Sequence, residues 1–257
     1  MVQPRTTRRS VPSAASLGLS RPHAAADLAA LGWDNEEHLD LLWTLAATGD
    51  PDRALITVVR LVENLRAGEK AGTVDSAAGV DPLLTALRDD VVFRVRLLAL
   101  FGASSLLGDH VVAAPGVWPE LRGAMPGRDE LMSTMLASVG AERAPGPHAE
   151  DSLLYRATVT GTAADRAMRS AYRTLLARIA AIDLAGTFVP WTSTHDVAGA
   201  PEPEPADFVT VTARLSDAAD AALTTALAVA VATVFPDGPV EAKLSVLATK
   251  MTSTSEM

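Results

Sequence analysis

The feature that most constrains the fold is a long stretch, residues 91–107, that is apolar on nearly every side. Arg94 and Arg96 are the charged residues in its interior. A helix that is hydrophobic all round lies in the middle of a protein, covered by other elements. The opening Val-Val-Phe alone would suit a strand, but the whole stretch is too long for one. We therefore expect one central buried helix, ended by Gly108.

Short helices with clear start signals surround this stretch. Asp50-Pro51 and Asp81-Pro82 each combine a capping side chain with a proline suited to the first helical turn. Asp109 is expected to cap a further helix in the same way. Helical periodicity later extends over residues 129–139, 163–185 and 207–234.

The last of these helices is expected to bury one stripe of side chains. Its members recur at steps of three or four residues, about one turn each: Phe208, Val211, Leu215, Ala219, Ala222 and Ala226. Of all residues 48% are hydrophobic but only 4% are aromatic, and such side chains suit close-packed helices better than β-sandwiches. The predicted fold class is mostly α, a multi-helix bundle followed by one orphan β-strand of an incomplete α+β domain.

Composition excludes several classes of function. The net charge of −9 disfavours nucleic-acid binding through a broad basic surface. The absence of cysteine excludes disulfides and thiolate metal sites and is compatible with a reducing cytoplasm. The most apolar window, residues 221–235, is short for a membrane span and is interrupted by threonines. We expect a soluble, cytoplasmic protein that contacts neither nucleic acid nor membrane.

The chain ends in a segment that does not complete a domain. Residues 243–249 have the character of a strand, and a strand needs neighbours to satisfy its backbone groups. The predicted organisation has four parts: a disordered tail over residues 1–20, a helical bundle over 21–145, a long-helix region leading to the next domain over 146–235, and a first strand with an aberrant tail over 236–257.

No assembled active site is visible in the sequence. Neither of the common glycine-rich phosphate loops is present, and the histidines lack metal-ligand spacing. A structural or surface role is favoured for three pairs of candidate residues: Asp109-His110, Asp50 with Asp52, and Asp217 with Asp220. Metal binding at His195-Asp196 and a catalytic site at residues 102–105 with Asp109 are rejected. We therefore predict no catalytic, cofactor-binding or metal-binding residue in this chain.

Several phrases together resemble a known family. They are Leu31-Gly-Trp33 with residues 38–43, Arg60-Leu-Val-Glu-Asn64, Ser105-Leu-Leu-Gly-Asp-His-Val-Val112 with Pro115 and Trp118, Tyr172-Arg173 with residues 179–185, and residues 215–223. In this order and spacing the chain, from about residue 17 to residue 249, resembles the N-terminal part of the bifunctional glutamine-synthetase adenylyltransferase/adenylyl-removing enzymes of actinobacteria.

The resemblance implies a role in nitrogen regulation. In that family a helical N-terminal region precedes a nucleotidyltransferase domain that removes AMP from a tyrosine of glutamine synthetase by phosphorolysis. The resemblance therefore implies that the orphan strand belongs to an incomplete nucleotidyltransferase α+β domain and that residues 146–235 lead to that domain. A second such domain attaches AMP from ATP, and a PII signal protein and glutamine choose between the two reactions. Glutamine synthetase and PII are therefore the implied partners, and ATP and Mg²⁺ the implied cofactors of the family.

The sequence departs from the family where its chemistry begins. After the strand matched by residues 244–248, the family pattern Gly-Lys-x-Gly-Gly-x-Glu-Leu and then Ser-Asp-x-Asp should follow, but the chain continues Lys250-Met251. We expect a truncated form that binds neither Mg²⁺ nor ATP and is inactive alone. The alternative is a non-catalytic helical interaction module that binds glutamine synthetase or a PII protein.

Overall fold

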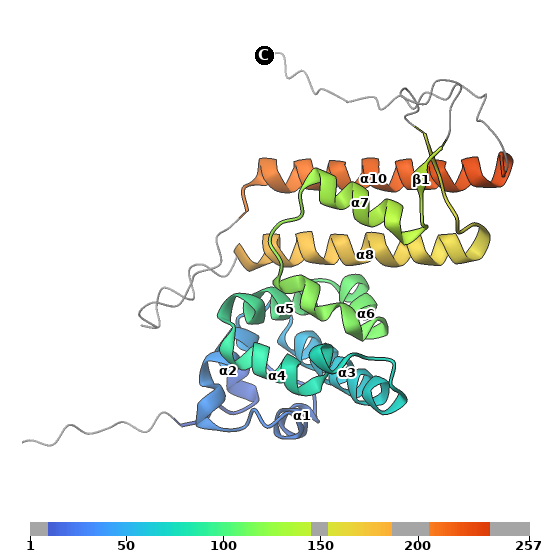
Figure 1. The fold of residues 1–257 in the computed structure, drawn as a ribbon. Coiled ribbons are helices and arrows are strands. Elements are labelled where there is room, and N and C mark those ends of the chain that lie inside the picture. Colours follow the sequence, from blue (N-terminus) through green and yellow to red (C-terminus); the bar gives the residue numbers. More distant parts are fainter. Residues whose placement is uncertain (1–9, 145–153, 187–205, 237–257) are drawn as a thin grey trace, which may run out of the picture.

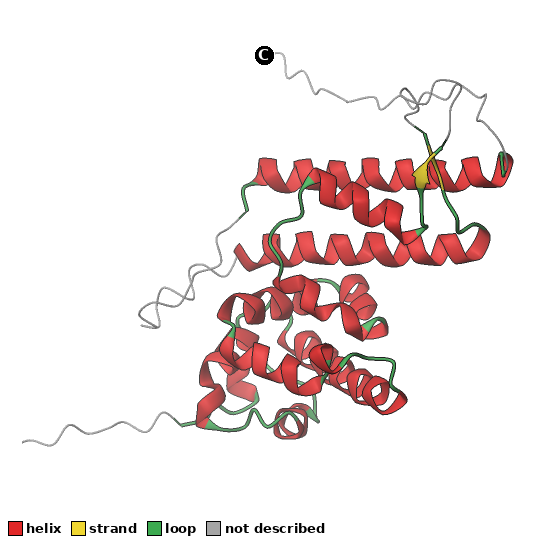
Figure 2. Ribbon diagram, viewed as in Figure 1, coloured by secondary structure: helices red, strands yellow, loops and turns green. Residues whose placement is uncertain are grey.

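A computed structural model describes residues 10–144, 154–186 and 206–236, and this part of the chain is mostly helical, as expected (Figure 2). The predicted strand over residues 243–249 lies outside the described residues. The described strands form a two-stranded antiparallel pair that aligns Glu142 with Arg156. The elements, in chain order, are η1 (Ala15–Leu17), α1 (Ala24–Ala30), η2 (Glu36–His38), α2 (Leu39–Ala46), α3 (Pro51–Ala71), η3 (Ser76–Ala78), α4 (Val80–Asp89), α5 (Val91–Ala103), α6 (Ser105–Ala113), η4 (Pro115–Arg122), α7 (Arg128–Ser138), β1 (Glu142–Arg143), β2 (Tyr155–Arg156), α8 (Gly161–Ala185) and α10 (Phe208–Val234).

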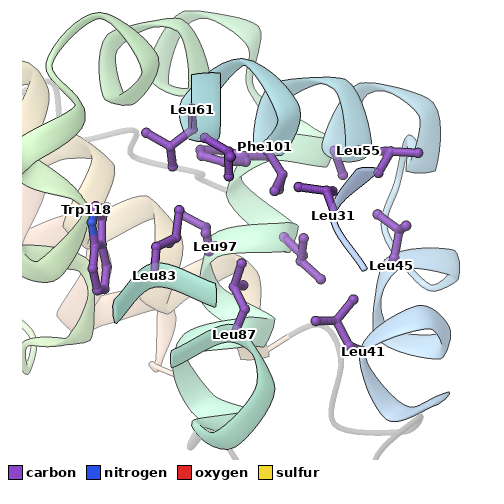
Figure 3. Close-up of a cluster of buried hydrophobic side chains, with 14 of the residues drawn as sticks. Leu31, Leu41, Leu45, Leu55, Leu61, Leu83, Leu87, Leu97, Phe101 and Trp118 are labelled. Atoms are coloured by element: carbon purple, nitrogen blue, oxygen red, sulfur yellow. The ribbon is translucent and has the colours of Figure 1, made fainter. Parts of the chain in front are cut away.

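Helices α1 to α6 and η4 form one body, which lies below α8 in Figure 1. Large side chains fill its core, and Figure 3 shows leucines from several helices converging on Phe101 of α5. Trp118 of η4 joins this core, and its indole N–H donates to the carbonyl of Ala78 over 2.7 Å. The buried donor is thereby satisfied while the ring adds a large apolar surface.

The central apolar stretch is two helices, so the expectation of one helix over residues 91–107 is wrong. Helices α5 and α6 meet at Ser104 at an angle of 117°. The Ser104 hydroxyl accepts a hydrogen bond from the backbone N–H of Leu107, which makes Ser104 the N-cap of α6. Gly108 and Asp109 therefore lie inside α6 and act as neither breaker nor cap.

The two arginines of α5 act on the ends of neighbouring helices. Arg94 is buried and donates to the carbonyls of Leu87 and Arg88 in the last turn of α4. Arg96 donates in the same way to three carbonyls at the end of η4, with its closest contact at 2.8 Å. A helix C-terminus carries unpaired carbonyls and partial negative charge, so both cations are stabilised inside an apolar helix.

One of the two repeated start signals works as expected. The Asp50 carboxylate caps α3 by accepting from the N–H of Arg53 at 2.9 Å, and Pro51 occupies the first turn. Asp81 does not cap α4, because that helix starts at Val80 with Gly79 at its N-cap position. The backbone N–H of Val80 is bound instead by the Glu69 carboxylate from α3.

Helices α7, α8 and α10 form a second region, a long bundle in the upper part of Figure 1. Helix α8 is shared, because Ala177 and Ala181 pack into the core of the first body while Leu175 and Ile179 pack against α7 and α10. This arrangement places α7, at the end of the predicted 21–145 segment, against helices of the predicted 146–235 segment. The predicted domain division itself stays a prediction.

The inner stripe expected for α10 is largely wrong. Val211 is buried, but Phe208 is 83% exposed and Leu215 is 43% exposed. The face that packs against α7 and α8 consists instead of small residues, among them Ala218, Ala221 and Thr225. Small side chains let helix backbones approach closely, and that contact decides which side of an alanine-rich helix is buried.

In length and composition, α10 is the one described helix that could cross a membrane. It extends well beyond the apolar window of residues 221–235. However, it packs one side against α7 and α8, and a single helix of this length and composition does not by itself indicate a membrane span.

Candidate functional site

Two of the segments that carry the family resemblance meet in space, on α3 and α6. The Arg60 guanidinium of α3 pairs with the Asp109 carboxylate of α6 at 2.6 Å. One helical turn further, the Asn64 side-chain amide donates to the carbonyl of Val112 at 2.8 Å. Both contacts join residues nearly fifty positions apart in sequence, so they fix α6 against α3.

A glycine permits this close approach. A Cβ at Gly108 would lie 3.3 Å from the Thr57 methyl carbon of α3, tighter than most real contacts of a Cβ. The glycine that the sequence suggested as a helix breaker is therefore a packing contact within α6.

Helix α8, which carries a third segment of the resemblance, contacts the same helix through the residue after Tyr172-Arg173. His110 is buried on α6, and its Nε2 lies 2.8 Å from the Thr174 hydroxyl of α8. Burial lowers the pKa of His110, and the nearby Arg173 guanidinium lowers it further. Asp109 and His110 therefore point to different helices, as expected for adjacent helical residues, and do not form an acid–base pair.

An open groove lies beside the Asn64 contact. It has a volume of about 590 Å³ and runs between the C-terminal half of α3, with the loop that follows it, and the junction of α6 with η4. Small and neutral residues line it, with Asn64, Gly68, Thr73 and Val117 among them. Such a groove can receive an apolar segment of a partner, and it offers no carboxylate or imidazole for chemistry.

The carboxylate pair of Asp50 and Asp52 is structural. Asp50 caps α3, while Asp52 does not share that role. It binds the backbone N–H and the hydroxyl of Ser20, at 2.9 and 2.5 Å, and so holds the segment before α1 against α3. Although burial alone raises the pKa of Asp52, the hydrogen bonds from Ser20 and Arg21 hold it below its usual value.

The pair of Asp217 and Asp220 on α10 is also structural. Arg128 at the start of α7 pairs with Asp217 at 2.8 Å and with Asp220 at 3.4 Å. Arg214 adds a second cation beside Asp217, at 2.7 Å. Because the Asp217 side chain is only 12% exposed, these ion pairs fasten α7 to α10 and are more than a solvated surface.

The remaining candidates do not assemble into a centre. His195-Asp196 lies outside the described residues. Residues 102–105 span the α5–α6 corner, and Asp109 is engaged by Arg60. Across residues 10–144, 154–186 and 206–236, no group of three or more His, Asp and Glu side chains could hold a metal ion. The absence of catalytic residues from the whole chain stays a prediction.

Comparison with curated proteins gives matches over almost the whole chain. It is 46% identical over 255 residues to a protein from Corynebacterium glutamicum and 42% identical over 280 residues to one from Corynebacterium diphtheriae, each match covering 94% of the chain. A Nocardia farcinica protein is 42% identical over 250 residues and 96% of the chain. All are named bifunctional glutamine synthetase adenylyltransferase/adenylyl-removing enzyme.

The chain is homologous to one segment of these enzymes. It spans 22% to 25% of the length of these curated relatives. No protein-family model and no solved structure matches the chain.

The contacts between the family segments could be found only in part from sequence. Arg60 and Asn64 are four positions apart and so share one face of α3, while Asp109 and Val112 are three apart and share one face of α6. That spacing marks a polar face on α3, but on α6 the acceptor beside Asp109 is the backbone carbonyl of Val112, which no side-chain pattern reveals. The spacing also does not reveal that the faces meet, because the bend at Ser104 sets the direction of α6.

Proposed function

We propose that the chain forms the helical, N-terminal scaffold beside the AMP-removing domain of a glutamine synthetase adenylyltransferase/adenylyl-removing enzyme. The observation that supports this role is that side-chain contacts join α3, α6 and α8, the helices that carry three of the family segments, in a chain homologous to one segment of those enzymes over 94% of its length. Helices locked in this way provide a rigid support and positions for partners, while the described residues supply no reacting group.

On this proposal the chain alone neither removes nor attaches AMP. Nucleotidyl transfer requires carboxylates that hold Mg²⁺ against phosphate oxygens. The carboxylates that come closest to such a pair are already bound by other groups of the protein: Asp50, Asp52, Asp109 and Asp217. The described residues therefore do not fit the Mg²⁺ and ATP that the family uses, and no catalytic step is assigned to them.

An AMP-release assay tests this function. The purified chain is incubated with adenylylated glutamine synthetase, inorganic phosphate and Mg²⁺, and the full-length Corynebacterium glutamicum relative serves as the positive control. We expect no AMP above the blank without protein. Release that depends on Mg²⁺ and scales with the concentration of the chain would refute the proposal.

A second candidate function is a binding module for glutamine synthetase or a PII protein in the cytoplasm. The open groove between α3 and α6 favours it, because it is an accessible hollow walled by neutral side chains. In calorimetric titrations, binding at tens of micromolar or tighter, about −6 kcal/mol or more favourable, would support this role. Replacement of Ala67 by Glu on the groove wall should weaken it, and titrations without heat for both partners would exclude it.

A further inference from the structure

Exposed large hydrophobic side chains are concentrated on one helix. Within the described part of the chain, five of the six such residues lie on α10 and the sixth, Leu106, lies on α6. The five are Phe208, Val209, Leu215, Leu223 and Val234. Single exposed leucines are ordinary on protein surfaces, but a concentration on one helix marks a binding surface.

Three of these residues, Phe208, Leu215 and Leu223, belong to one uncharged face of α10. Exposed residues recur on it at steps of one or two turns, and we call them the outer face: Phe208, Leu215, Ala219, Leu223, Ala226 and Ala230. The charged side chains of the helix, Arg214, Asp217 and Asp220, lie on other sides. With 27 residues the helix is about 40 Å long, so the face extends along most of the bundle.

A hollow adjoins the outer face where α10 meets α8. It has a volume of about 230 Å³, and its apolar walls come from Met135, Met168, Tyr172 and Ala222. Ala222 lies three positions after Ala219, so the hollow opens beside the middle of the outer face.

Two charged residues also line this hollow. Asp165 and Arg169 of α8 lie on its wall, four positions apart in sequence. Neither makes an ion pair with another residue that the structure describes, so both remain available to polar groups of a partner.

The area of the outer face indicates what kind of partner covers it. A helix face about 40 Å long and about 10 Å wide offers about 400 Å² per partner. Two copies of the chain joined through it would bury about 800 Å², below the roughly 1,200 Å² of stable complexes between separate proteins. Contacts between domains of one chain can be smaller, about 600–1,500 Å², because the linkage keeps the partners together.

A membrane is a poor match for this face. Helices that lie on lipid surfaces carry lysine and arginine along their polar side. The polar side of α10 carries Asp217 and Asp220 with a single arginine, Arg214, and the whole chain has a net charge of −9. Electrostatic attraction to anionic lipids is therefore missing.

We propose that the outer face of α10 is an interdomain docking surface, covered by an amphipathic helix from the portion of the family enzyme that lies outside the region matched by this chain. That portion makes up about three quarters of the length of the relatives. The docked helix places an apolar side chain in the Met135–Tyr172 hollow and completes a four-helix bundle with α7, α8 and α10. The inference rests on the homology and on the proposed place of the chain within the family enzyme, and it does not require that the chain be inactive or that it bind glutamine synthetase or a PII protein.

Thiol labelling provides the test, because the chain contains no cysteine. Ala219→Cys puts a thiol on the outer face, and Ala213→Cys puts a control thiol on an exposed position on another side of α10. Each is made in the isolated chain and in a full-length chimera, in which the chain replaces the matched segment of the Corynebacterium glutamicum relative. Maleimide modification is followed at each site by mass spectrometry.

Both thiols should react at similar rates in the isolated chain. In the chimera the Ala219→Cys thiol should react at least about tenfold more slowly, as expected if the docked state outweighs the open one by about ten to one. The Ala213→Cys thiol should be unchanged, and a further Leu223→Asp substitution should restore labelling at position 219. If the chimera fails to fold, the same substitution in the relative itself, at the residue aligned with Ala219, gives the answer.

Equal labelling of position 219 in the isolated and full-length proteins would overturn the proposal. Protection already present in the isolated chain and rising with its concentration would also overturn it, since a second copy would then be the occupant. Labelling requires no enzymatic activity, so its outcome is independent of the AMP-release assay.

Discussion

The first body and the α7–α8–α10 bundle are packed by different means. The body buries large side chains on all sides, and Trp33, Phe93, Phe101 and Trp118 are its bulkiest members. In the bundle α10 contributes mainly alanines to the contact, among them Ala218, Ala221 and Ala228, and most of the exposed large hydrophobic residues lie on it. The difference shows that one part of a helical protein can bury its large hydrophobic side chains completely while another part leaves them exposed for a further partner.

This contrast has an energetic consequence. The hydrophobic contribution grows with the apolar area removed from water, about 25 cal/mol per Å². A leucine- and aromatic-rich core removes more of that area per residue than an alanine-rich seam does. We therefore expect single core substitutions to cost more in the body than in the bundle.

The largest expected effect is that of Phe101→Ala at the centre of the body. Phe101 is fully buried on α5, and its loss should lower the free energy of unfolding by about 3–5 kcal/mol. The matched change in the bundle is Ala221→Gly on α10, which should cost about 1 kcal/mol through helix propensity. Urea denaturation followed by circular dichroism measures both, and equal losses would contradict the contrast between the two regions.

A pair of glycines gives the next largest effect. Gly140 follows α7 with a φ of +58°, and a Cβ there would overlap the Thr158 hydroxyl. Gly32 of the body has a φ of +72° but no neighbour within 4 Å of a new Cβ. Gly32→Ala should therefore lower the free energy of unfolding by about 1–2 kcal/mol from backbone strain alone. Gly140→Ala should cost the same strain and about 1 kcal/mol more, because the new Cβ displaces the Thr158 hydroxyl from its hydrogen bond to the carbonyl of Val139.

Thermal unfolding of the two variants distinguishes these contributions. The midpoint for Gly140→Ala should lie below that for Gly32→Ala. The reverse order would mean that the turn after α7 adjusts more easily than its contacts indicate.

The sequence predicts most of the helices of this fold but not how they are oriented relative to one another. The helical class and the cap at Asp50 follow from local signals, and the structure confirms them. The break between α5 and α6 at Ser104 could not be predicted, because apolar residues precede and follow the corner and two small serines interrupt them only briefly. A serine that can cap a new helix is the only local sign of the bend, and such serines also occur inside helices.

The buried side of α10 could not be predicted for a related reason. On an alanine-rich helix several faces have similar hydrophobicity, and close approach to α7 and α8 decides between them. The stripe with the largest side chains, including Phe208 and Leu215, was the natural choice for a core, and it proves to be the exposed one. A sequence pattern that calls for burial and a structure that leaves it exposed together point to a partner.

The smallest expected effect concerns His110, which connects the two regions through Thr174. Burial, helped by Arg173, lowers the pKa of His110 in the folded protein. The unfolded chain therefore takes up its proton first as the pH falls below about 6.5, and folding stability decreases with it. This contribution is fully present above pH 6.5 and is lost as the pH falls through the folded-state pKa.

His110→Gln retains a polar side chain beside Thr174 but cannot titrate. Its thermal midpoint should therefore fall less than that of the natural chain between pH 7.5 and pH 5.5. His38→Gln is the matched control, because burial also lowers the pKa of His38 but that residue lies at η2, away from α8. The opposite result would contradict this prediction: His38→Gln would remove the pH dependence of the thermal midpoint and His110→Gln would leave it intact. Protonation would then destabilise the first body at His38 and not the contact between α6 and α8.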